Sequence, residues 1–195
     1  MQQLIFASGN RHKAEEIEAA LPSGFRIIIM KEAGITEDIP EPFDTLEENS
    51  KHNADFLYNR LLQDCFAEDT GLEVYALDLK PGVFSARFAG PERDDEANKK
   101  KLLQLLEGIT DRRARFRTVI ALYENGKVTY FEGILEGEIS LEPIGNSGFG
   151  YDAIFKPNES QLTLGEMEES QKNKISHRKQ ALSKLVKYLS DSFEN

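Results

Sequence analysis

The stretch LIFASGNRHKAEE, residues 4–16, passes from an apolar run through a small polar turn into helical spacing. Residues 3–8 predict a strand, and the pattern that follows predicts a helix over 12–21 that ends at a proline. The next run, FRIIIM at residues 25–30, is β-branched and predicts a second strand. The chain is therefore expected to open with a β-α-β unit.

Two cations, Arg11 and Lys13, stand at the start of that first helix. Cations there oppose the helix dipole, which favours negative charge at this end, so the sequence indicates an anionic ligand. The whole chain carries 24 Lys and Arg against 34 Asp and Glu, for a formal net charge of −10. That balance disfavours a general nucleic-acid binder, because phosphate-backbone affinity comes from a basic surface. Any phosphate ligand is therefore expected to be bound locally.

The length of 195 residues predicts one domain over 1–195. The single cysteine, Cys65, leaves no internal disulfide, and we expect it to be a packing residue in a reducing compartment. No apolar run is long enough to span a bilayer, and no basic region precedes the short apolar run at the N-terminus. We therefore expect a cytoplasmic protein with no membrane or nucleic-acid partner.

A long helix follows an acidic loop that contains prolines. Its apolar residues recur on one face from Thr45 to Cys65, with Asp44 or Thr45 as the candidate N-cap. The next strand is predicted over 65–69. We expect it to end in a turn at Thr70-Gly71.

The second half of the chain predicts a further helix, a hairpin and a C-terminal helix. Helical spacing covers 94–107. The dipeptide Asn125-Gly126 is the strongest short hairpin signal, and it predicts antiparallel strands over 115–123 and 127–139. A glycine-rich loop then precedes the strand pattern YDAIF, and Ser176 is expected to cap the last helix.

Four stretches place polar groups where a buried core does not need them: SGNRHK, AEDTGLEV, GNSGFGYD and QKNKISHR. Each lies at a strand end, a glycine turn or a helix start, where ligands bind in open α/β sheets and backbone N–H groups can meet phosphate oxygens. Taken alone, each has a plainer interpretation: an ordinary strand-to-helix turn, a β-turn, a flexible loop, or a solvent-facing His177. The adjacent acids Glu68 and Asp69 would repel each other unless a cation lies between them, which favours a metal site.

Taken together and in order, these motifs resemble the family of non-canonical purine nucleoside triphosphate pyrophosphatases, the inosine and xanthosine triphosphatases. The resemblance covers nearly the whole chain. Its motifs are Ala7-Ser8-Gly9-Asn10-x-x-Lys13, Glu48-Asn49, Glu68-Asp69-Thr70-Gly71-Leu72, Pro81-Gly82-Val83-Phe84-Ser85-Ala86-Arg87, Gly148-Phe149-Gly150-Tyr151-Asp152, Lys172-Asn173 and Ser176-His177-Arg178.

The resemblance implies an α/β fold, an elongated mixed β-sheet flanked by helices, with two lobes and the active cleft between them. It implies a homodimer that cleanses the nucleotide pool by hydrolysing the triphosphates ITP, dITP and XTP to the monophosphate and pyrophosphate. It further implies Mg²⁺ as the cofactor and a water that attacks the α-phosphorus.

On the phosphate side, the resemblance implies Asp69 as the general base and a metal ligand, with Glu41 as the second carboxylate on Mg²⁺. Thr70 would add a hydroxyl or an N–H group to the phosphates. The triphosphate would be cradled by Ser8, Gly9, Asn10, Arg11, His12 and Lys13, of which Arg11 occupies a variable position.

On the base side, the resemblance implies a pocket with an aromatic ring to stack on the purine and donors for an oxygen at its six position. Adenine carries an amino group there and would leave those donors unpaired, which discriminates strongly in a buried site. The matching residues are Phe149, Gly150, Tyr151, Asp152, Lys172, His177 and Arg178.

The chain departs from the family pattern at three places. Asn53 stands where the family commonly has a lysine on the long helix, so one phosphate counter-charge is absent from that position. Ala153 replaces a proline, and Asp78-Leu79-Lys80 replaces a glycine pair, changes that affect loop stiffness more than chemistry. Two alternatives stay open: a Maf-like nucleotide pyrophosphatase that acts on other bases, and a nucleotide-binding sensor without turnover.

Overall fold

The computed structural model describes residues 2–8, 14–15, 17–18, 21 and 24–193. The chain divides into two compact units, each assembled from separate segments. Unit 1 comprises Met1–Asp69, Thr118–Gly133 and Gln180–Asn195, and unit 2 comprises Thr70–Arg117 and Ile134–Lys179. The expectation of one domain over 1–195 stays a prediction.

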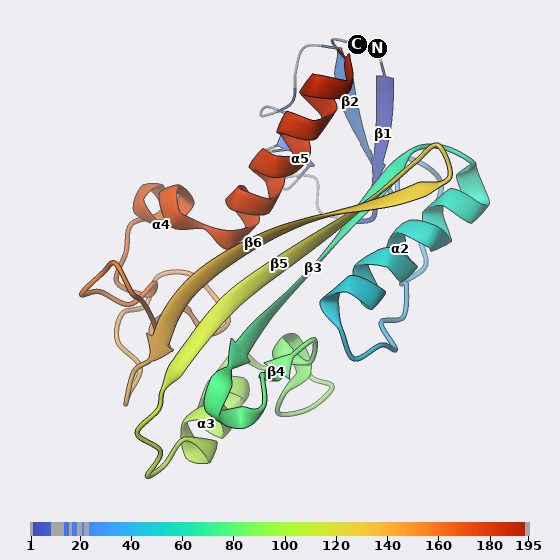
Figure 1. Cartoon of the computed structure of the whole chain (residues 1–195). Coiled ribbons are helices and arrows are strands. Elements are labelled where there is room, and N and C mark those ends of the chain that lie inside the picture. The colour runs from blue at the N-terminus through green and yellow to red at the C-terminus, as the bar shows by residue number, and fades with distance from the viewer. Residues whose placement is uncertain (1, 9–13, 16, 19–20, 22–23, 194–195) are drawn as a thin grey trace. The chain divides into compact units, whose positions relative to one another are not determined.

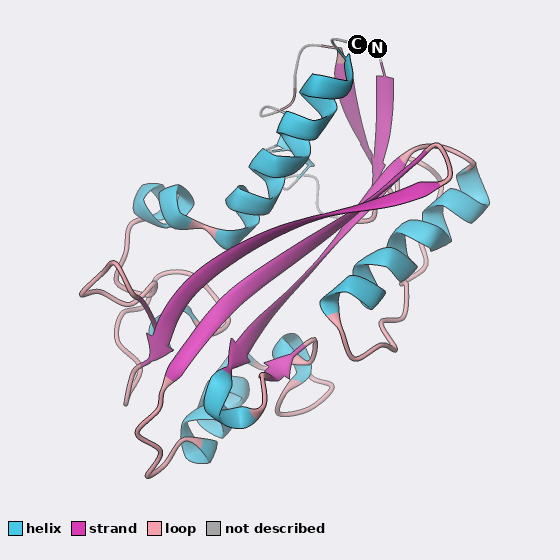
Figure 2. Ribbon diagram, in the orientation of Figure 1, coloured by secondary structure: helices cyan, strands magenta, loops and turns pink. Residues whose placement is uncertain are grey.

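The strands of the described residues form one mixed sheet in the order β2-β1-β3-β5-β6-β7, with β4 paired to β3 (Figures 1 and 2). Strand β1 is parallel to β2 and to β3, whereas β4 is antiparallel to β3 and β7 is antiparallel to β6. The mixed α/β sheet expected from the sequence is confirmed. The strands are β1 (Gln2–Phe6), β2 (Phe25–Ile29), β3 (Cys65–Val74), β4 (Lys80–Gly82), β5 (Arg113–Glu124), β6 (Lys127–Ile139) and β7 (Phe155–Pro157).

The opening β-α-β unit is confirmed as far as the described residues extend. Leu4 of β1 pairs with Ile27 of β2 in parallel register, and residues 14–15 and 17–18 between the two strands are helical. Parallel neighbours need such a crossover, because a tight turn can join only antiparallel strands.

The α-helices of the described residues flank this sheet, and their capping follows local chemistry (Figure 2). The Thr45 hydroxyl accepts the N–H of Glu48 at the start of α2, and the Asp94 carboxylate accepts two N–H groups of α3. Ser176 Oγ accepts the N–H of Lys179 at 3.4 Å, which confirms it as the cap of α5. The helices are α2 (Leu46–Leu61), α3 (Asp95–Leu105), α4 (Glu169–Ile175) and α5 (His177–Phe193). No helix of the described residues is long and apolar enough to cross a membrane.

In unit 1, α5 and α2 cover opposite faces of the strands (Figure 1). Phe66 of β3 packs in a core cluster with Ala181 and Leu185 of α5. Its neighbours Cys65 and Ala67 belong to a different cluster, which includes residues of α2. This alternation is what a strand with period two produces when both faces are buried.

Cys65 is a packing residue, as expected, but it begins β3 instead of ending a helix. Helix α2 stops at Leu61, and Leu62 adopts a left-handed conformation with φ of 50°. The Cys65 thiol is buried, and burial raises its pKa to about 12. A thiol held in its protonated form is a poor nucleophile, which agrees with a structural role.

The Asn125-Gly126 hairpin is confirmed. Both residues have positive φ, 50° and 76°, as a type I′ turn requires. The first arm extends slightly further than predicted, to Arg113–Glu124, and the second, Lys127–Ile139, has the predicted bounds.

Two local predictions are wrong. Thr70-Gly71 is not a turn, because β3 runs without interruption to Val74 and Leu72 pairs with Gly82 of β4. Glycine is needed there since a Cβ on Gly71 would lie 2.5 Å from the Gly82 carbonyl oxygen. The pattern YDAIF is also not one strand: Asp152–Ile154 form a 3₁₀ turn, and β7 begins only at Phe155.

Candidate functional site

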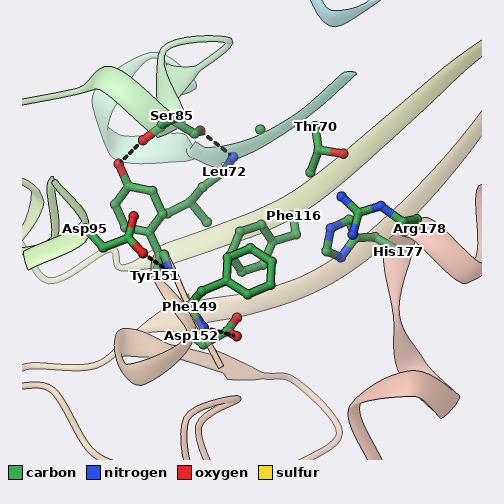
Figure 3. A pocket seen from close by; sticks show the side chains of 13 residues that line it. Thr70, Leu72, Ser85, Asp95, Phe116, Phe149, Tyr151, Asp152, His177 and Arg178 are labelled. Atoms are coloured by element: carbon green, nitrogen blue, oxygen red, sulfur yellow. Dashed lines mark hydrogen bonds between the residues drawn. The ribbon is translucent and has the colours of Figure 1, made fainter. Parts of the chain in front are cut away.

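Unit 2 contains a cavity of about 250 Å³ (Figure 3). Strand β3 contributes one wall, the start of α5 another, and the glycine-rich loop before β7 a third. The lining residues are Thr70, Gly71, Leu72, Ser85, Ala86, Asp95, Phe116, Phe149, Gly150, Tyr151, Asp152, His177 and Arg178. All the base-side residues expected from the sequence line this cavity except Lys172, which contacts its wall through Asp152.

The cavity has a flat aromatic wall. The ring of His177, the first residue of α5, stacks on Phe116 with centroids 5.1 Å apart and planes within 10°. Phe149 stands on the loop with 75% of its surface exposed, so its ring is accessible to a ligand (Figure 3). Flat rings in this arrangement suit a planar heterocycle, which gains both apolar burial and stacking.

An ion pair lies beside this wall. Lys172 Nζ of α4 is 2.5 Å from Asp152 Oδ2, and the Phe149 N–H donates to the same oxygen at 3.1 Å. Asp152 is 8% exposed. Gly148 makes the pair possible: its φ is +84°, and a Cβ there would overlap the Asp152 carboxylate. An ammonium has three donors, so Lys172 can contact a ligand while it binds Asp152.

Tyr151 joins the loop to β3 and β4. Its hydroxyl donates to the Ser85 carbonyl oxygen at 2.8 Å, and burial raises the pKa of the phenol, which therefore stays a donor. Ser85 Oγ accepts the N–H of Leu72 at 2.8 Å and donates to the Gly82 carbonyl at 2.6 Å. These hydrogen bonds give the end of the loop a defined position against β3 and β4.

Sequence reasoning missed Asp95 and Ser85 as parts of the site. Asp95 was an ordinary acid at a helix start, yet its Oδ2 accepts the Gly150 N–H at 2.7 Å from 55 positions away. Only the acid-rich start of α3 could have drawn attention to it, and nothing local indicates its partner.

In unit 1, two asparagines one turn apart on α2 each donate a hydrogen bond to a carboxylate that the sequence predicts as a metal ligand. Asn49 Nδ2 donates to Asp69 Oδ2 at 3.2 Å, and Asn53 Nδ2 donates to Glu41 Oε1 at 3.4 Å. Residues four apart lie on the same helix face, so both carboxylates are directed to one face of α2. Nothing local in the sequence indicates either partner.

Asn49 orients Asp69 firmly. It is fully buried, and its Oδ1 accepts the Phe43 N–H at 3.1 Å while its Nδ2 also donates to the Phe43 carbonyl at 3.3 Å. The amide is thereby fixed between the acidic loop and β3.

The expectation that a cation lies between the adjacent acids Glu68 and Asp69 is wrong. Glu68 and Asp69 are consecutive within the continuous strand β3, and successive side chains of a strand point to opposite faces. A cation cannot lie between them as it could at a turn. Asp69 is directed to the α2 face, where its partner is Asn49.

The α2 face that Asp69 and Glu41 share offers oxygen donors to a divalent cation. Among the residues that the structure describes, no three His, Cys, Asp or Glu side chains gather into a metal site. Glu41 and Asp69 offer carboxylate oxygens, and Asn53 Oδ1 is a buried oxygen to which no described residue donates a hydrogen bond. These are hard oxygen donors of the kind that Mg²⁺ prefers, so the residues fit that ion.

The phosphate-cradle residues Gly9, Asn10, Arg11, His12 and Lys13 lie outside the described residues. Ser8 lies two residues after the end of β1, and its carbonyl accepts the Met30 N–H at 3.3 Å. Thr70, the other residue expected at the phosphates, lines the cavity of unit 2 and follows Asp69 on β3.

A mixed sheet and a pocket with an aromatic wall and an internal ion pair define an α/β protein that binds a small molecule. The chain belongs to the Ham1 family, whose family model matches residues 4–188.

Relatives and solved structures agree with this assignment. A dITP/XTP pyrophosphatase of Christiangramia forsetii is 48% identical over 96% of this chain and 99% of its own, and that of Porphyromonas gingivalis is 47% identical over 97% and 98%. The Ham1 protein of Staphylococcus aureus superposes with a TM-score of 0.93 at 35% identity, covering 98% of this chain and all of its own.

Proposed function

We propose that this protein hydrolyses the non-canonical purine nucleoside triphosphates ITP, dITP and XTP to the monophosphate and pyrophosphate. The observation that carries this proposal is the unit 2 pocket, where an aromatic wall stands beside the Asp152–Lys172 pair. Support comes from the relatives named dITP/XTP pyrophosphatase, which match nearly the whole chain. The family match also favours this function over the Maf-like alternative.

The base binds between Phe149 and the His177–Phe116 stack. Lys172, His177 and Arg178 present donors, which an oxygen at the six position of the purine accepts. Adenine would turn an amino group toward these donors and leave them unpaired, so ATP binds poorly. Gly150 and Tyr151 position the loop: the Gly150 N–H binds Asp95, and the Tyr151 hydroxyl binds Ser85.

Asp69 and the residues around it carry out the reaction at the phosphates. Asn49 orients the Asp69 carboxylate, which accepts a proton from the water that attacks the α-phosphorus. Ser8 to Lys13 and Thr70 bind the phosphate oxygens. Glu41 and Asp69 would hold Mg²⁺, which when bound neutralises negative charge on the triphosphate.

The same proposal includes a homodimer in the cytoplasm. The enzyme would remove damaged nucleotides from the pool before a polymerase can use them. A sensor without turnover is the second candidate, and the Asn49–Asp69 contact argues against it because a sensor needs no oriented proton acceptor.

Replacing His177 with alanine tests the base side. We expect kcat/KM for inosine triphosphate to fall about 10–100-fold, because one buried polar group left unpaired costs about 1–3 kcal/mol, with a smaller loss for adenosine triphosphate. The reason is that the variant loses one donor and the ring that stacks on Phe116. Pyrophosphate release with both substrates measures the change in their ratio.

The control is Lys174→Ala, which removes an exposed cation of α4 that does not line the pocket. It should leave the ratio of kcat/KM for inosine triphosphate to kcat/KM for adenosine triphosphate unchanged. Equal losses on both substrates for His177→Ala would show that the residue serves packing or phosphate binding instead.

A further inference from the structure

In the side-chain amide of Asn53, the nitrogen makes a hydrogen bond within the described part of the chain and the oxygen does not. The residue is 7% exposed, and its Nδ2 donates to Glu41 Oε1 at 3.4 Å. Its Oδ1 is buried and has no hydrogen-bond partner among the residues that the structure describes. The orientation of this amide follows from chemistry: an ionised carboxylate only accepts, so the atom that faces Glu41 is the N–H group. The opposite atom is therefore a carbonyl oxygen, to which no donor in the described part of the chain binds.

A buried oxygen that accepts no hydrogen bond destabilises the fold unless a donor or a cation binds to it. Asn49, one turn earlier, shows the contrast, because its Oδ1 accepts the Phe43 N–H and its Nδ2 has two acceptors. The nearest lysine in sequence, Lys51, binds Asp55 at the next turn of the same helix. Two residues before Asn53, it faces another side of α2.

The missing group must be a donor or a cation, since a carbonyl oxygen repels phosphate oxygens. A neutral amide oxygen beside a carboxylate is a frequent combination around hard divalent ions. Glu41 already accepts from the other end of the same amide, so a cation bound at Glu41 would lie within reach of this side chain.

We propose that Asn53 is an additional residue of the divalent-cation site, whose Oδ1 contacts the ion directly or through one of the ion's waters. This rests on the proposed function, which places Mg²⁺ at Glu41 and Asp69. Asn53 thus has two roles: its N–H positions the Glu41 carboxylate, and its oxygen completes the ligand set. An ammonium at position 53 would instead compete with the cation for Glu41.

The test measures cation binding apart from turnover. Mn²⁺ is titrated into the whole protein, saturated with a non-hydrolysable inosine triphosphate analogue, and free Mn²⁺ is followed by electron paramagnetic resonance. We expect Asn53→Leu to raise the Kd for Mn²⁺ about tenfold or more, as losses around metal ligands do. Asn53→Asp keeps an oxygen there and should bind within about threefold of the parent, by the same ligand chemistry.

Melting temperature in EDTA separates this role from a structural one. Asn53→Leu removes the unfilled oxygen, so the metal-free protein should melt at the same or a higher temperature. Lys51→Met is the matched control on the same helix, and it should leave Mn²⁺ affinity unchanged.

Parent-like Mn²⁺ affinity in Asn53→Leu, while Glu41→Gln weakens binding, would overturn the assignment of Asn53 and leave the metal site standing. It would mean that a water molecule, and not the cation, satisfies Asn53 Oδ1 by donating a hydrogen bond to it. A parent protein that binds no Mn²⁺ would overturn the assignment together with the metal role of Glu41. Pyrophosphate release from inosine triphosphate, measured in parallel, shows whether the proposed hydrolysis survives either result.

Discussion

Replacing Asp69 with asparagine should lower turnover of inosine triphosphate by about 10²–10⁴-fold, the range for loss of a general base, and a weakened metal site should add to the loss. The variant keeps the shape of the side chain but cannot accept the proton of the attacking water. The fold should be preserved because the asparagine oxygen can still accept the Asn49 Nδ2–H group, which now lies 3.2 Å from Asp69 Oδ2.

The measurement pairs turnover at saturating Mg²⁺ with the melting temperature of the substrate-free protein. Asp44→Asn is the matched control: it makes the same change of charge at an exposed acid before α2 and should have parent-like turnover. Turnover of Asp69→Asn within a few-fold of the parent would mean that Asp69 is structural. A collapse of the melting temperature that explains the loss would have the same meaning.

The second large effect is expected for Gly71→Ala, which adds one methyl group to β3. The new Cβ would lie 2.5 Å from the Gly82 carbonyl oxygen and 2.7 Å from its carbon. Backbone cannot move aside without displacing β4, and overpacking of this kind costs about 1–3 kcal/mol. For a chain of this length, each kcal/mol corresponds to about 2–4 °C of melting temperature.

Activity should suffer as well, because Ser85 binds both Leu72 and Gly82 and also accepts the Tyr151 hydroxyl. A shift of β4 therefore reaches the base pocket, and we expect kcat/KM to fall by about 10²-fold, as misplacements near 1 Å do.

Gly90→Ala is the matched control for this prediction. Its Cβ would also lie 2.5 Å from an oxygen, but that oxygen is Glu92 Oε2, at the end of a side chain that can rotate away. Its melting temperature and activity should be close to those of the parent. If both variants behave alike, the close approach of β3 and β4 does not constrain the pocket.

Sequence signals of a few residues predicted those turns and helix starts that the same few residues determine. Asn125-Gly126 predicted the hairpin because both residues tolerate positive φ, and Ser176 predicted the start of α5 because its hydroxyl accepts a backbone N–H. The same reasoning failed at Thr70-Gly71, where the glycine serves a close approach of β4 and not a turn.

The contacts that orient the site were beyond such reasoning. Asn49 and Asp69 are 20 positions apart, and Ser85 and Tyr151 are 66 apart, so no periodicity within one element reveals them. Helix α4 was missed for a different reason. It has seven residues, none of them buried, and hence no apolar stripe, although Glu168 and Gln171 form a capping box at its start.

The resemblance to nucleotide pyrophosphatases predicted more of the site than the residue pattern did, because it joins motifs that are distant in sequence. One departure gains meaning from the structure: Asp78 and Leu79, which replace a glycine pair, have φ of 51° and 63°. Side chains in that region cost about 1–2 kcal/mol per residue, so this turn is strained where glycine would be relaxed.

The proposed function depends on cleavage of six-oxo purine triphosphates at the α-phosphorus. Incubation with inosine triphosphate and Mg²⁺ in ¹⁸O-labelled water, followed by mass spectrometry of the products, tests it most directly, with adenosine triphosphate as the comparison substrate. We expect pyrophosphate as the first product, the label in inosine monophosphate, and much slower cleavage of adenosine triphosphate. Inosine diphosphate and labelled orthophosphate as the first products would contradict it.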